Sequence, residues 1–106
     1  MAYCLGRKIR ALTPRQGNNR GVEQCIGIGR FKAPHMSGGR IAGNVSFLLY
    51  SDGFGDKITP KDMLGALGGG RIKEREEADK ALRTLAKTGV RRGCRDNMSA
   101  IYLGCS

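Results

Sequence analysis

The sequence has no tryptophan, a single histidine, few aromatic residues and no long hydrophobic run. With only three tyrosines and three phenylalanines, the core of the protein has to be mostly aliphatic. No apolar run approaches the roughly 18 residues that are needed to cross a bilayer, and no secretory signal is present. We therefore expect a cytoplasmic protein that does not contact membranes.

The four cysteines and the lone histidine give little support to a metal site with nitrogen or sulfur ligands. Cys4, Cys25, Cys94 and Cys105 include no C-x-x-C pair, which is the spacing typical of a zinc site. We interpret them as reduced thiols. His35 stands in a Pro-Gly loop without a neighbouring carboxylate or cysteine, so nothing favours it as a general base or ligand.

Acidic residues are also scarce, because 9 Asp and Glu stand against 19 Lys and Arg, for a net charge of +10. Such a charge raises encounter rates with polyanions, phosphoproteins or anionic membranes without selecting among them. A small basic nucleic-acid-binding module is one interpretation. The few aromatics and the lack of a groove-reading motif make nucleic acid an unlikely partner.

The residues that are present predict one small domain of 106 residues with mixed secondary structure. The run "VSFLLYS" (45–51) predicts a buried strand, and "MSAIYLGC" (98–105) predicts another. Between them, Thr59-Pro60 with Asp62 predicts a helix start. Apolar residues at helical spacing predict a second helix over about 72–88, ending at Gly89.

Two acidic turns flank the two predicted strands. Asp52 follows the first strand, and Asp96 precedes the second. If the strands are antiparallel neighbours, the end of one lies beside the start of the other, so both carboxylates emerge at the same edge of the sheet. Two carboxylates without Cys or His ligands suit a hard cation such as Mg²⁺ or Mn²⁺. Asp in a turn is also common for purely structural reasons.

Three segments, in order, resemble the metal-dependent protein phosphatases of the phosphatase 2C family. "LLYSDGFGD" resembles the strand-turn of that family, and "EADKALRTLAKTGVRRGCRDNMSAIYL" resembles its last helix, its "DN" turn and its final strand. "NNRGVEQCIGIG" is similar to a segment of the bacterial members that precedes the strand-turn. The resemblance covers residues 18–103.

The resemblance implies an α+β fold in which two antiparallel sheets pack face to face as a β-sandwich flanked by helices. It further implies hydrolysis of phosphoserine and phosphothreonine in protein substrates, with two Mn²⁺ or Mg²⁺ ions that activate a water. Carried over, Asp52 and Asp96 would be carboxylate ligands of one metal. Asn97 would hold its turn, and Gly53 would lie close to the metal. Asp56 would either lie near the metal or only cap the next helix.

The arginines around the second turn have two interpretations. They could attract a phosphorylated protein substrate, or they could be ordinary solvated charges that partly offset Asp96. The residues concerned are Arg91, Arg92 and Arg95.

The sequence also departs from the family in what it lacks. The first half of a typical member carries an Asp-Gly-His-Gly type motif whose aspartate bridges both metals, whereas Asp52-Gly53 is the only Asp-Gly in this chain. Residues 1–106 are therefore interpreted as the C-terminal part of a phosphatase 2C-like domain. The missing N-terminal half would be supplied by another segment or a partner chain. The alternative is a non-catalytic remnant or regulatory fragment of the same family.

Overall fold

The computed structural model describes residues 1–6, 8–13, 36, 38–41 and 43–105, with four strands and three helices among them. Three features of the sequence lie outside these residues: the alternating run 22–31, which predicts a short strand, the segment "NNRGVEQCIGIG", and His35. In chain order the elements are β1 (Ala2–Leu5), β2 (Ile9–Ala11), β3 (Val45–Tyr50), α1 (Asp52–Gly55), α2 (Pro60–Leu67), α3 (Arg75–Arg91) and β4 (Ala100–Cys105).

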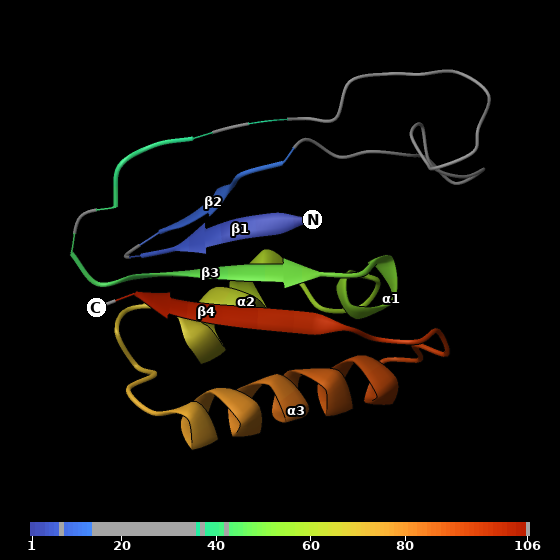
Figure 1. The fold of residues 1–106 in the computed structure, drawn as a ribbon. Helices are drawn as coiled ribbons and strands as arrows, with labels where there is room; N and C mark the ends of the chain where they lie inside the picture. The colour runs from blue at the N-terminus through green and yellow to red at the C-terminus, as the bar shows by residue number, and fades with distance from the viewer. Residues whose placement is uncertain (7, 14–35, 37, 42, 106) are drawn as a thin grey trace.

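The four strands form one antiparallel sheet in the order β2-β1-β3-β4 (Figure 1). The two strands predicted from the sequence, β3 and β4, pair directly, with Val45 opposite Cys105 and Tyr50 opposite Ala100. The helices α1, α2 and α3 all occur between these two paired strands. The expected antiparallel neighbours are thus confirmed, and the mixed α+β class with them.

The core lies between the sheet and the helices, with α2 behind the sheet and α3 running along β4 (Figure 1). Leu48 of β3 is fully buried, and it clusters with Phe54 of α1, Met63 of α2 and Leu85 of α3. Burial of such side chains contributes roughly 1.5–3 kcal/mol each. Among the described residues, this cluster is made of aliphatic side chains, one methionine and one phenylalanine, as the scarcity of aromatics predicts.

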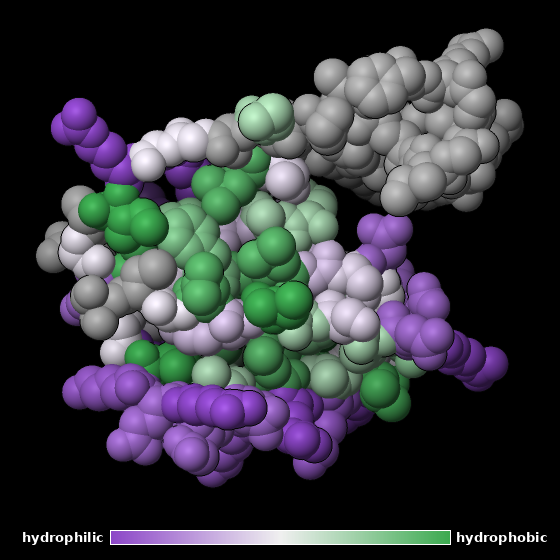
Figure 2. Space-filling model, viewed as in Figure 1, coloured by the Kyte–Doolittle hydropathy of each residue, from purple (hydrophilic) through white to green (hydrophobic). Residues whose placement is uncertain are grey.

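The opposite face of the sheet is apolar and open. Because side chains alternate along a strand, Leu49 points away from the face that buries Leu48, and Ile101 lies opposite Leu49 in β4. Leu49, Ile101 and Leu103 are 46%, 65% and 56% exposed. Figure 2 shows hydrophobic side chains gathered over the sheet, with hydrophilic ones along α3. We call Leu49, Ile101 and Leu103, with the half-buried Phe47, the open face.

The start of α2 confirms the prediction. The Thr59 hydroxyl accepts a hydrogen bond from the Asp62 amide (3.2 Å), and the Asp62 carboxylate accepts one from the Thr59 amide (2.9 Å). This capping box satisfies two amides that lack partners within the helix. Pro60 fills the first helical position, and Gly68 is the C-cap.

The predicted boundaries of α3 are wrong at both ends. The helix begins at Arg75 and continues through Gly89 to Arg91. Gly89 does not terminate it, because this glycine serves close packing: a Cβ there would lie 2.8 Å from Met98 Cε. The chain leaves the helix at Gly93, with φ +102°. The Cys94 and Gly93 amides donate to the Gly89 and Val90 carbonyls (both 3.0 Å), which is a Schellman motif.

No pattern in the sequence predicts β1 and β2, which have only four and three residues. Both strands are short, and β2 lies at the edge of the sheet, where a charged residue such as Arg10 is tolerated. No described helix is both long and apolar enough to span a membrane. The described residues form a single sheet, so the second sheet of the expected sandwich is not among them.

Candidate metal centre

The acidic turns lie at the same end of the β3–β4 pair. Beyond the last paired residues, Ser51 and Ser99 extend the contact between the strands: the Ser51 amide donates to the Ser99 carbonyl (2.9 Å), and the Ser99 amide donates to the Ser51 hydroxyl (3.0 Å). Asp52 follows Ser51 directly, and Asp96 precedes Ser99 by three residues. The turns that carry both aspartates are therefore fixed beside each other by strand pairing.

The two turns are also in van der Waals contact. Gly53 is buried, and a Cβ at this position would overlap the Asn97 carbonyl oxygen and lie 3.3 Å from Asp96 Cβ. Only a residue without a side chain permits this approach. Packing thus requires a glycine after Asp52, because the second acidic turn passes directly over its backbone.

Both carboxylates are exposed at this contact. Asp96 Oδ1 accepts a hydrogen bond from the Asn97 amide (2.8 Å), which fixes the carboxylate and leaves Oδ2 available. Within the described part of the chain, neither Asp52 nor Asp96 forms an ion pair. Two exposed oxygen donors from adjacent turns are the ligand type that Mg²⁺ and Mn²⁺ prefer, so these residues are candidate ligands of such a cation.

The ligand set is small. Among the described residues, no cluster of three or more His, Cys, Asp or Glu side chains could enclose a metal. Asp56 caps the C-terminus of α1, is exposed, and has no hydrogen bond with another described residue through its carboxylate. Two carboxylates and water bind a divalent cation weakly, because affinity depends on the number of charged ligands and on the rigidity of the site. As metal ligands, Asp52 and Asp96 would therefore account for only part of a centre.

A cavity of about 510 Å³ opens beside Asp52, at the end of the sheet where β3 ends and β1 and β4 begin. Its lining includes Tyr50, Ser51, Asp52, Ser99 and Ile101, and so it joins the acidic turn to the open face. Burial, a hydrogen bond with Tyr3 and the negative charge of Asp52 raise the pKa of Tyr50. The phenol is neutral at physiological pH, so it adds no negative charge that would attract a cation to Asp52.

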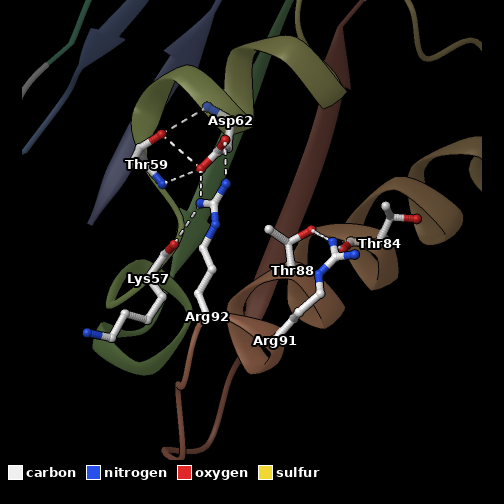
Figure 3. Close-up of polar contacts among 7 residues, drawn as sticks. All are labelled: Lys57, Thr59, Asp62, Thr84, Thr88, Arg91 and Arg92. Atoms are coloured by element: carbon white, nitrogen blue, oxygen red, sulfur yellow. Dashed lines mark hydrogen bonds and ion pairs between the residues drawn. The ribbon is translucent and has the colours of Figure 1, made fainter.

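The three arginines near Asp96 differ in their contacts. Arg92 donates to the Asp62 carboxylate (2.6 Å) and to the Lys57 carbonyl (3.0 Å), and so joins the end of α3 to the start of α2 (Figure 3). Arg91 donates to the Thr88 hydroxyl (3.3 Å). Arg95 is exposed, next to Asp96 in sequence. Arg92 is therefore engaged in a contact between helices, which leaves Arg95 and Arg91 as the better candidates for substrate steering.

Sequence reasoning missed Cys94, which is 5% exposed and lies in the contact between the two turns. Its thiol donates to the Gly53 carbonyl (3.2 Å), and so it bonds the second acidic turn to the first. A signal was available in the sequence. Gly93-Cys94 directly follows an amphipathic helix, and the residue after a left-handed C′ glycine commonly packs an apolar side chain inward.

Comparison with known proteins adds no identity: no family model and no curated protein matches the sequence, and no solved structure matches the fold.

Proposed function

We propose that this chain supplies the Asp52 and Asp96 ligands of a Mn²⁺- or Mg²⁺-dependent hydrolase of phosphoserine and phosphothreonine in proteins, as the C-terminal part of a phosphatase 2C-like domain. One observation carries the proposal. The "SDG" turn and the "DN" turn, far apart in sequence, pack against each other at one end of a strand pair. The order of the resembling segments is its second support.

The chemistry divides between the cation and the chain. A cation bound at this centre would lower the pKa of a coordinated water and offset charge on the phosphoryl oxygens. Asp52 and Asp96 would hold it, each from a turn anchored to the sheet. Arg95 and Arg91 would raise the local concentration of a phosphorylated protein, an effect that weakens with salt.

The open face supports the proposal that another part of the domain covers this side of the sheet. Sheets of globular proteins normally bury an apolar face against another layer, and two sheets stacked face to face are a stable solution. Here Leu49, Ile101 and Leu103 are about half exposed or more, in one patch. The proposed occupant is the N-terminal half of a phosphatase 2C-like domain, which would bring the bridging aspartate that this chain lacks.

Complementation tests the function. The chain is mixed with, or fused to, the N-terminal half of a phosphatase 2C-like protein, and release of phosphate from a phosphothreonine peptide is measured with Mn²⁺. We expect Mn²⁺-dependent turnover that neither part shows alone, and a loss of at least tenfold with Asp96→Asn. The matched control is Asp79→Asn, which removes an exposed carboxylate of α3 that pairs with Arg83.

The result that would overturn the proposal is a folded complex without Mn²⁺-dependent turnover. If that complex binds Mn²⁺, the chain is a non-catalytic remnant of the family. If the chain instead binds single-stranded nucleic acid at physiological salt, and loses it on substitution of Arg91 and Arg95, the basic-module interpretation replaces the enzyme.

A further inference from the structure

The contact between the acidic turns has a donor at its centre. Cys94 Sγ donates to the Gly53 carbonyl oxygen (3.2 Å) and lies 4.0 Å from the Asp96 carbonyl oxygen. The thiol is thus bonded to the backbone of the residue after Asp52, while its own backbone lies two residues before Asp96. No other described side chain hydrogen-bonds the turn of Gly53 to the segment from Cys94 to Asn97.

The backbone on both sides of this hydrogen bond is held in place by other contacts. The Schellman motif at the end of α3 fixes Cys94, because its amide is bonded to the Gly89 carbonyl. The missing side chain at Gly53 lets the Asn97 peptide lie directly on α1. Cys94 is 5% exposed and Gly53 is buried, so water does not compete for this hydrogen bond.

We propose that Cys94 and Gly53 are positioning residues, which together hold the Asp96 turn against the Asp52 turn at a fixed separation. Cys94 supplies the hydrogen bond, and Gly53 supplies the clearance. Neither residue contacts the cation or the substrate. The consequence for cation affinity rests on the proposed function, whereas the consequence for the separation of the turns does not.

The side chain at position 94 has to be small and has to donate. Alanine keeps the volume low but removes the donor, which leaves the Gly53 carbonyl without this partner. Serine keeps a donor with a shorter reach. We therefore expect Cys94→Ala to loosen the contact and Cys94→Ser to retain most of it.

The separation is measured on the metal-free full chain by NMR. We expect a strong nuclear Overhauser effect between the Gly53 Hα and the Asp96 Hβ protons, weakened at least twofold in Cys94→Ala and retained in Cys94→Ser. The control is Leu67→Val, a core substitution at the C-terminus of α2, where the adjacent loop bonds Gly6 at the other end of the sheet. An unchanged effect in Cys94→Ala overturns the proposal.

The affinity is measured on the same variants, from the free Mn²⁺ signal in electron paramagnetic resonance. We expect Cys94→Ala to weaken Mn²⁺ binding severalfold, Cys94→Ser to restore it, and Leu67→Val to leave it unchanged. If Leu67→Val weakens binding as much as Cys94→Ala, Cys94 contributes only general stability and the positioning role is refuted. If the unaltered chain binds no Mn²⁺ while the NMR result holds, the proposed function fails and the positioning role stands.

Discussion

At the scale of single residues, the positions of the acidic turns depend on two glycines. Gly53 has no side chain, and the second turn occupies the space where a Cβ would be. Gly93 adopts a left-handed conformation that other residues rarely adopt, and this turns the chain from α3 toward Asp96. The sequence identified Asp52-Gly53 as a turn, but it could not show that another segment lies on the glycine.

The substitution Gly53→Ala tests this close approach. We expect it to lower the free energy of unfolding by about 1–3 kcal/mol, because the Asn97 carbonyl is backbone and must shift to admit a methyl group. Urea denaturation measures the change. Gly65→Ala is the matched control, because a Cβ at Gly65 of α2 meets nothing within 4 Å. That substitution should stabilise the chain by up to about 1 kcal/mol, and a similar effect of both substitutions would contradict the account.

At the scale of elements, the sequence predicted what depends on local chemistry. The capping box at Thr59 and Asp62 and the strand β3 were confirmed because their signals lie within a few residues. The role of Gly89 was predicted wrongly because it depends on tertiary packing. This glycine packs against Met98 and Ile58, which a helical pattern does not reveal. β1 and β2 were missed because they gain stability from β3, beside β1, rather than from their own residues.

The site residues divide in the same way, into those that local sequence patterns predict and those that depend on tertiary contacts. The antiparallel pairing that brings Asp52 and Asp96 to one edge follows from two strand patterns and a helical excursion between them. The contact of Arg92 with Asp62 joins residues thirty positions apart, and no local pattern encodes it. The sequence therefore placed Arg92 with Arg91 and Arg95, as residues that either steer a substrate or are ordinary solvated charges.

The pair of Asp62 and Arg92 predicts a pH dependence. The Arg92 guanidinium, with the Thr59 amide and hydroxyl, holds the pKa of Asp62 well below its usual value of about 3.9. Because the folded-state pKa is lowered, the contribution to stability is present above about pH 4 and declines as the pH falls below that value. Thermal unfolding of Asp62→Asn should therefore show a deficit at pH 7 that shrinks toward pH 2.

The control for this prediction is Asp79→Asn, whose exposed pair with Arg83 lies within one helix and contributes little. Its melting temperature should stay close to that of the unaltered chain at every pH. A deficit in Asp62→Asn that grows as the pH falls would mean that the carboxylate is not stabilised by Arg92.

At the scale of the whole molecule, the sheet has one packed face and one open face. The helices cover the side of Leu48, whereas the open face has no covering layer among the described residues (Figures 1 and 2). Monomeric proteins rarely expose large contiguous apolar patches unless another surface binds there. We propose that the N-terminal half of the domain covers this face.

Polar substitution of the open face should separate folding from assembly. Ile101→Thr with Leu103→Thr keeps β-forming residues in β4 and removes apolar surface. We expect the isolated chain to unfold within about 1 kcal/mol of the original, because both side chains are already more than half exposed. The complementation assay should lose most of its activity. Val90→Thr, at an equally exposed position of α3, should leave both the stability and the complementation activity unchanged.

If Asp52 and Asp96 bind one divalent cation, a titration of the chain with Mn²⁺ should detect it. The free Mn²⁺ signal is followed for the unaltered chain and for Asp52→Asn, Asp96→Asn and Asp79→Asn. The account predicts one weak site that either of the first two substitutions abolishes and that Asp79→Asn preserves. Binding that survives the loss of Asp52 or Asp96, or that all three substitutions weaken equally, would contradict it.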